Sequence, residues 1–143
     1  MAHPTASADD GRRDAVALGL LRGALPGLIA VYRFGSSATG ASRPDSDVDL
    51  GVLADRRLDP VARFALQEQL AGALLRDVDL VDLRSASTVM ASQVVTTGVL
   101  LYGGDAPARH VFEDFVFGRY ARLNEERRGI LDRIAREGTV YGG

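Results

Sequence analysis

Two aspartates that stand one residue apart, Asp47 and Asp49, open the apolar run 48–53, whose composition predicts a strand. Side chains at positions i and i+2 of a strand point to the same face, so the two carboxylates lie side by side while Val48 and Leu50 face the core. Adjacent like charges repel, and Mg²⁺ relieves such repulsion because it prefers carboxylate oxygens and substrate phosphates as ligands. The spacing therefore predicts a metal site.

A turn of small residues precedes this pair. Gly35-Ser36 closes a predicted strand, and ten residues separate it from Asp47. Bare backbone N–H groups and a hydroxyl allow phosphate oxygens to approach closely. The segment is not a Walker loop, because the Gly-Lys-Ser/Thr ending is absent. We expect a phosphate-binding turn here.

A two-metal site needs a third carboxylate, and the run VDLVDL at 78–83 predicts a strand that offers three. Alternation places Asp77 and Asp79 on one face of this strand and Asp82 on the other. Asp79 is the better candidate because, like Asp49, it sits inside its strand between two apolar residues. Asp77 and Asp82 are expected at solvated strand edges or in caps.

Helices alternate with strands along the chain, without an internal repeat or a linker. Helices are expected at 11–25 after the cap Asp10, from Pro60 after the cap Asp59, from Ser85 or Ser87 to about Thr97, and from 106 to about 137; strands are expected at 28–34, 48–53, 78–83 and 99–102. This order predicts an α/β or α+β fold, with one layer of helices over a small mixed sheet. We expect a disordered tail over 1–9 and a single domain over 10–143.

Two of these helices carry broad apolar faces. On the helix after Asp59, the face includes Val61, Phe64, Leu70 and Leu74. The last helix has apolar residues at 112, 115, 116, 123, 130, 131 and 134 on one side and the charged run NEERR at 124–128. That run is expected to be solvated, while the helix is also a candidate to dock a partner or to close a nucleotide cleft.

The composition excludes several classes of protein. The chain has 143 residues, a formal net charge of -2, no cysteine and two histidines. These counts exclude a cysteine nucleophile, an iron–sulfur cluster and an imidazole-rich metal site. The net charge is near zero and the basic residues are scattered, which argues against a large nucleic-acid-binding face. All 17 basic residues are arginine. No apolar run reaches membrane-spanning length and the N-terminus lacks the pattern of a signal peptide, so we expect a cytoplasmic protein.

The pattern GSx10DxD, followed by a helix and an apolar strand with one more Asp, resembles the minimal nucleotidyltransferase branch of the DNA polymerase β-like nucleotidyltransferases. The resemblance covers roughly residues 10–137. Three features are similar to the antitoxins of HEPN/MNT toxin–antitoxin pairs: the size, the segment VDLVDLRSAS, and the segment QVVTTGVLLYGGD before a long C-terminal helix. The resemblance implies a nucleotidyltransferase fold with a mixed sheet flanked by helices.

The resemblance also implies a reaction, the Mg²⁺-dependent transfer of AMP from ATP to a tyrosine of a partner HEPN ribonuclease, which is thereby silenced. Asp47 and Asp49 would bridge two Mg²⁺ ions. Asp79 would bind the catalytic ion and help to activate the incoming hydroxyl. Gly35 and Ser36 would hold the triphosphate.

The chain departs from the family pattern in the turn. Many members carry Arg directly after the Gly-Ser and again before the next Gly, where this chain has Ser37 and Thr39. The departure bears on the rate rather than on the class of reaction. Ser37 remains an expected nucleotide contact, and Arg43, or Arg33 before the turn, is the expected phosphate-binding cation.

Two other functions stay open at this point. One keeps the chemistry and replaces the acceptor with a small molecule, as in the related aminoglycoside nucleotidyltransferases, which usually have an additional domain for the drug. The other is an antitoxin that neutralises its toxin by stoichiometric binding, with a catalytically weak site. The nucleotide preference, the number of AMP groups transferred and the oligomeric state cannot be predicted from the sequence.

Overall fold

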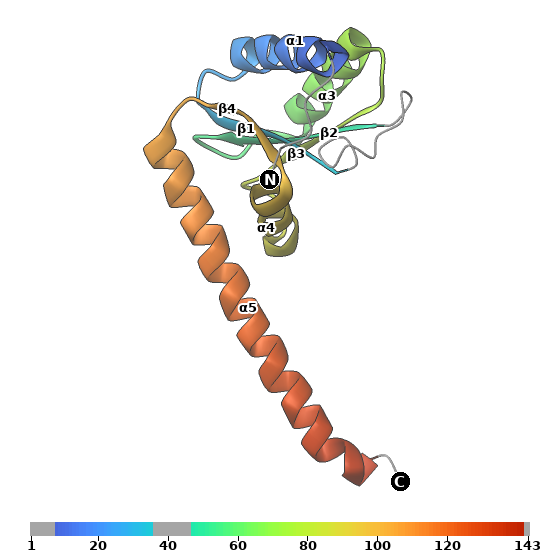
Figure 1. The fold of residues 1–143 in the computed structure, drawn as a ribbon, viewed down its shortest axis with the longest axis vertical. Helices are drawn as coiled ribbons and strands as arrows, with labels where there is room; N and C mark the ends of the chain where they lie inside the picture. The colour runs from blue at the N-terminus through green and yellow to red at the C-terminus, as the bar shows by residue number, and fades with distance from the viewer. Residues whose placement is uncertain (1–7, 36–46, 142–143) are drawn as a thin grey trace.

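The computed structural model describes residues 8–35 and 47–141. Its elements, in chain order, are α1 (Ala8–Ala24), β1 (Leu28–Phe34), β2 (Val48–Ala54), α3 (Pro60–Leu74), β3 (Val78–Asp82), α4 (Thr88–Thr97), β4 (Val99–Gly103) and α5 (Ala106–Tyr141) (Figure 1). Each predicted strand and helix is present within a few residues of its expected bounds. The largest differences lie at the end of α5, which continues four residues beyond the expected 137, and at the start of α1, which begins three residues early.

The four strands form one mixed sheet in the order β3-β2-β1-β4. β1 pairs antiparallel with both β2 and β4, whereas β2 and β3 are parallel. A parallel pair needs a crossover connection, and α3 supplies it. The sheet therefore places the strand that carries Asp49 directly beside the strand that carries Asp79.

Helices cover both faces of the sheet, so the expected single layer of helices is wrong (Figure 1). On one face, Leu21 of α1 and Leu70 of α3 pack against Leu50 and Leu80. On the other face, α4 and the first turns of α5 pack against β1 and β2. Strand alternation explains the two cores, because each central strand presents apolar side chains to both sides.

Local signals explain most helix ends. The side chain of Asp59 accepts a hydrogen bond from the N–H of Ala62 at 3.0 Å, and Ser87 accepts one from the N–H of Met90 at 3.1 Å, as N-caps do. The prediction that Asp10 caps the first helix is wrong. Asp10 lies inside the first turn of α1 and pairs with Arg13 at 3.3 Å. Residues 1–7 of the expected disordered tail lie outside the described residues.

The apolar face predicted for α3 is only partly right. Leu66, Leu70 and Leu74, each four residues apart, are buried against the sheet. Val61 and Phe64 are 77% and 54% exposed, so their assignment to the core is wrong. One narrow side of α3 covers the sheet, and positions 61 and 64 lie outside that side.

Among the described residues, the buried side chains of α5 lie in the N-terminal part of the helix. Phe112 and Val116 are buried, whereas Phe115, also expected in the core, is 56% exposed. The charged positions 125–128 are exposed, as predicted. The helix then continues well beyond the sheet (Figure 1). None of the described helices is long and apolar enough to span a membrane.

Candidate active site

Asp49 and Asp79 lie side by side on neighbouring strands. In the parallel β2–β3 pair their Cα atoms are direct partners, so both side chains are on the same face of the sheet. Val48 and Leu50, which flank Asp49, are buried in the core on the opposite face, as the alternation predicted. Asp47 immediately precedes β2, is exposed, and shares the face of Asp49 by alternation. The sheet thus brings the three predicted carboxylates to one end of one face.

The turn after β1 touches this group through its glycine. Phe34 is the antiparallel partner of Asp49, and Gly35, with φ 73°, follows it. A Cβ atom at position 35 would lie 2.3 Å from Oδ2 of Asp49, closer than real contacts allow. Glycine is required here twice, for the left-handed backbone and for the close approach of the carboxylate. The sequence predicted a phosphate-binding role for Gly35 and did not reveal this contact.

The surroundings of Asp49 disfavour its negative charge. Burial raises the pKa of the Asp49 carboxyl above its usual range, and the charges of Asp79 and then Asp47 raise it further. The three groups are therefore close enough to interact electrostatically. A bound cation reverses this penalty, because it favours the charged form of each carboxylate.

Among the described residues, no group of three Asp, Glu, His or Cys side chains is gathered closely enough to form a complete metal site. Mg²⁺ seldom needs one, since it is usually held by one or two carboxylates together with water and substrate phosphates. The carboxylate oxygens of Asp47, Asp49 and Asp79 are hard ligands of the type that this ion prefers. The described residues fit an ion shared with a substrate better than one enclosed by protein.

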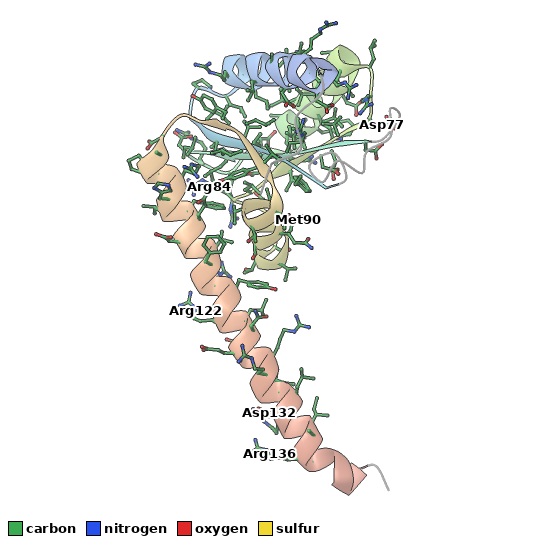
Figure 2. The ribbon with its side chains drawn as sticks, in the orientation of Figure 1. Asp77, Arg84, Met90, Arg122, Asp132 and Arg136 are labelled. Atoms are coloured by element: carbon green, nitrogen blue, oxygen red, sulfur yellow. The ribbon has the colours of Figure 1, made fainter. Side chains whose placement is uncertain are left out.

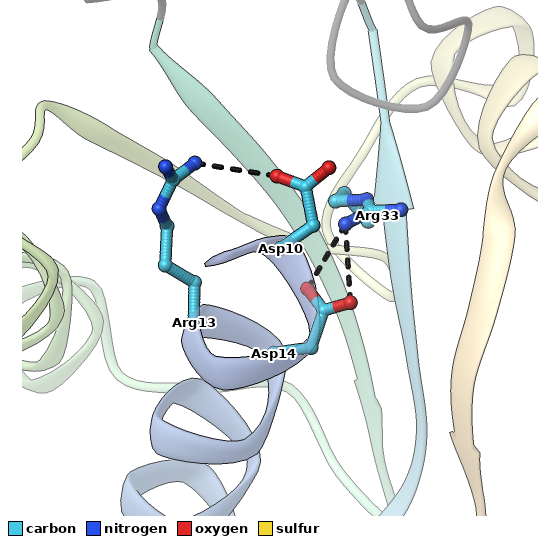
Figure 3. Close-up of polar contacts among 4 residues, drawn as sticks. All are labelled: Asp10, Arg13, Asp14 and Arg33. Atoms are coloured by element: carbon cyan, nitrogen blue, oxygen red, sulfur yellow. Dashed lines mark hydrogen bonds and ion pairs between the residues drawn. The ribbon is translucent and has the colours of Figure 1, made fainter. Parts of the chain in front are cut away.

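The remaining predicted nucleotide contacts, Ser36, Ser37 and Arg43, lie outside the described residues, and so does Thr39. Arg33 is described, and the expectation that it faces the phosphates is wrong. Its Nη1 donates to both carboxylate oxygens of Asp14 at 3.1 Å on the α1 face of the sheet (Figure 3). Strand alternation places Arg33 on the face opposite Phe34 and Asp49. Burial raises the pKa of Asp14, and the nearby guanidinium opposes that shift.

Asp82 was predicted either at a solvated strand edge or in a cap. It acts as a cap, and its side chain is buried, with only 5% of the residue exposed. Its carboxylate accepts hydrogen bonds from the N–H of Leu58 at 2.9 Å, the N–H of Arg84 at 3.2 Å and Oγ of Ser85 at 2.8 Å. These bonds tie the end of β3 to two loops. Asp77 is exposed just before β3 (Figure 2). Neither residue is among the charges that raise the pKa of Asp49.

Carboxylates on two parallel strands lie beside a glycine turn in a mixed sheet that helices cover on both faces, which is the arrangement expected from the resemblance to nucleotidyltransferases. The family model described as "Polymerase beta, Nucleotidyltransferase" matches residues 24–106. The chain belongs to this nucleotidyltransferase family.

Individual relatives give a more specific comparison than the family model does. The chain is 45% identical to the protein adenylyltransferase MntA of Shewanella oneidensis over 115 residues, which cover 80% of this chain and 82% of the relative. A crystal structure of a toxin–antitoxin pair with AMP-PNP contains a chain that is 43% identical, with a TM-score of 0.77, covering 85% of this chain and 98% of that one. A structure of a tri-AMPylated S. oneidensis HEPN toxin in complex with MNT antitoxin matches at 41% identity and a TM-score of 0.74, covering 87% and 98%. The chain is a homologue of the MntA antitoxin, and the predicted resemblance is confirmed.

Proposed function

We propose that this protein is an antitoxin that transfers AMP from ATP to a tyrosine hydroxyl of a partner HEPN toxin and so neutralises it. The observation that carries this proposal is the in-register pair Asp49 and Asp79 beside the Gly35 turn. Support comes from the homology with MntA, which is named a protein adenylyltransferase, and from the AMP-PNP and tri-AMPylated toxin complexes of similar proteins. We place its action in the cytoplasm.

In this proposal Asp47, Asp49 and Asp79 would hold two Mg²⁺ ions, with Asp79 acting toward the incoming hydroxyl. The bound ions would supply Lewis acidity at the α-phosphate and neutralise charge on the departing pyrophosphate. Asp49 is suited to the central position, because its pKa is raised by burial and by both other carboxylates. A bound cation would oppose this shift, because it favours the charged form of the carboxylate.

The residues of the chain then direct a single substitution at phosphorus. The tyrosine oxygen forms a bond to the α-phosphorus, the bond from that phosphorus to the bridging oxygen of pyrophosphate breaks, and pyrophosphate leaves. Asp79 orients the incoming hydroxyl, and the hydroxyl proton passes to solvent water as the bond to phosphorus forms. Gly35, with Ser36, Ser37 and Arg43, holds the triphosphate, so the attacking and leaving oxygens are in line.

The test compares the same substitution at Asp79 and at Asp77, two aspartates that lie two residues apart at the start of β3. The chain is co-expressed with the product of the neighbouring gene as the expected HEPN partner, with Mg²⁺ and ATP present, and intact masses of both proteins are recorded. We expect AMP adducts on the toxin, their loss in Asp47→Asn/Asp49→Asn and in Asp79→Asn, and their retention in Asp77→Asn. The Asp77 variant removes the same charge two residues away and leaves the proposed site complete.

Two outcomes would reject the proposal. Toxin inhibition with complex formation but without any adduct would make the chain a stoichiometric antitoxin. AMP transfer to an aminoglycoside in place of the toxin would make it a small-molecule nucleotidyltransferase. Equal loss of adducts in Asp77→Asn and Asp79→Asn would refute the assignment of the third carboxylate.

A further inference from the structure

Leu75 opens the turn that joins α3 to β3, residues 75–77, in a conformation that leucine disfavours. Its backbone is left-handed, with φ 54° and ψ 40°, and in the described part of the chain the only other residue with positive φ is Gly35. Glycine or asparagine usually occupies such a position at the end of a helix. Leu75 is also 89% exposed, more than any other large apolar residue that the structure describes. Folding alone therefore does not explain a leucine here.

Backbone hydrogen bonds hold this α3–β3 turn at both ends. The N–H groups of Leu75 and Arg76 both donate to the carbonyl oxygen of Ala71, the second at 3.3 Å. The carbonyl oxygen of Asp77 accepts a hydrogen bond from the N–H of Val48 at 2.9 Å. The turn therefore presents the side chain of Leu75 to solvent from a fixed backbone.

The α3–β3 turn lies at the same end of the sheet as the predicted carboxylates. Val48, to which it is bonded, directly precedes Asp49 at the start of β2. Asp77 belongs to the turn and lies just before β3 (Figure 2). Asp79 follows Leu75 by four residues, which span at most about 14 Å in any conformation. Leu75 is thus exposed within about 14 Å of the third carboxylate.

The order of the strands places the α3–β3 turn on the side from which an acceptor would reach the site, a step that rests on the proposed function. β3 is an edge strand, and the turn at Gly35 lies on the other side of β2, after β1. Transfer needs the attacking oxygen and the departing pyrophosphate on opposite sides of the α-phosphorus. With the triphosphate at Gly35, the acceptor hydroxyl therefore arrives over the edge of β3, beside Asp79.

A protein acceptor would cover Leu75 as it brings its hydroxyl to Asp79. An interface of ordinary size buries about 800 Å² on each partner, a patch wider than the distance between these two residues. The apolar body of a tyrosine, or an apolar side chain next to it, would bury the exposed leucine. A polar, cationic small molecule would gain nothing from it. We propose that Leu75 contacts the acceptor protein beside its tyrosine and so helps to select it.

The experiment measures the initial rate of AMP transfer to the partner toxin at varied toxin concentration, and then at varied ATP concentration. Leu75→Asn keeps a residue that tolerates the left-handed backbone and removes the apolar side chain. We expect the KM for the toxin to rise about tenfold, while kcat and the KM for ATP stay within about twofold of wild type. Leu75→Met keeps an apolar side chain of similar size and should keep the KM for the toxin near the wild-type value.

A second readout separates contact with the acceptor from a role in folding. Glycine and asparagine relieve the strain at position 75, so Leu75→Gly and Leu75→Asn should raise Tm while they weaken use of the toxin. A residue needed only for folding would change Tm and transfer in the same direction. Val61→Asn is the control, because Val61 is 77% exposed on the same helix, about 21 Å from Leu75 along its axis. It should leave both KM values unchanged.

The outcomes distinguish this inference from the proposed function. Wild-type transfer with an unchanged KM for the toxin in Leu75→Asn would overturn the role of Leu75 and leave the proposed function standing. An equal rise in Leu75→Asn and Val61→Asn would overturn it as well, because the effect would not depend on the position. A rise in the KM for ATP alone would assign Leu75 to the nucleotide instead. A wild-type chain that adds no AMP to the toxin would reject the proposed function, and this contact with it.

Discussion

Substituting Gly35 with alanine tests whether the turn after β1 positions the carboxylate of Asp49. The left-handed backbone at position 35 costs alanine about 1–2 kcal/mol. Its Cβ would lie 2.3 Å from Oδ2 of Asp49, where ordinary contact begins at 3.4 Å, so the carboxylate or the turn must move by about 1 Å. A displacement of this size at a reacting group costs on the order of 100-fold in rate. We therefore expect a small loss of stability and a much larger loss of AMP transfer.

Two measurements separate these effects. Thermal unfolding should show a decrease of about 2–8 °C in Tm, as expected for 1–2 kcal/mol in a domain of this size. The initial rate of AMP addition to the toxin, followed by intact mass at a temperature where both proteins are folded, should fall by about two orders of magnitude. Gly118→Ala is the control, because its Cβ meets nothing within 4 Å and a helical glycine gains about 1 kcal/mol on this change. A Gly35→Ala protein with the wild-type rate would refute the proposed positioning.

Two further substitutions test the charges of the sheet. Burial, Asp79 and Asp47 raise the pKa of Asp49 in the folded state, so folding stability falls as the pH rises through that pKa. Asp49→Asn should therefore raise Tm at neutral pH with a chelator present. This gain should vanish below about pH 4, where the carboxyl is protonated in both states. A lower Tm for this variant at neutral pH would contradict the linkage. Asp82→Asn turns one of the acceptor oxygens of a buried carboxylate into a donor, so we expect a loss of about 2–3 kcal/mol in urea unfolding, with the AMP-transfer rate preserved. Unchanged stability would show that these bonds contribute little.

The elements that a local signal marks were predictable from the sequence. Asp59-Pro60 marks the start of α3, and the alternation around Asp49 and Asp79 assigns their strands and faces. The geometry of the site follows from this alternation, since two parallel strands in register bring the same-face residues together. The roles of these residues in catalysis remain predictions.

The features that escaped prediction depend on contacts between distant segments. Arg33 pairs with Asp14, nineteen positions earlier, on a face that the sequence pattern does not assign to α1. Phe64 is apolar and at helical spacing, yet the sheet is covered by another side of the same helix, which carries Leu66 and Leu70. The contact between Gly35 and Asp49 requires the pairing of β1 with β2, which a sequence pattern indicates only through its turn.

Because the register of β2 and β3 positions Asp49 and Asp79, the site should tolerate point substitutions nearby but not a change in that register. Backbone hydrogen bonds, rather than the side chains around them, set the separation of Asp49 and Asp79. Point substitutions in α3 or in the core should therefore leave this separation nearly intact. A deletion of one residue in β3 would turn Asp79 to the opposite face, into the core beside Leu70, and remove a carboxylate from the site in a single step. During divergence, we therefore expect this site to be lost more readily through a change in strand register than through gradual substitution of the residues around it.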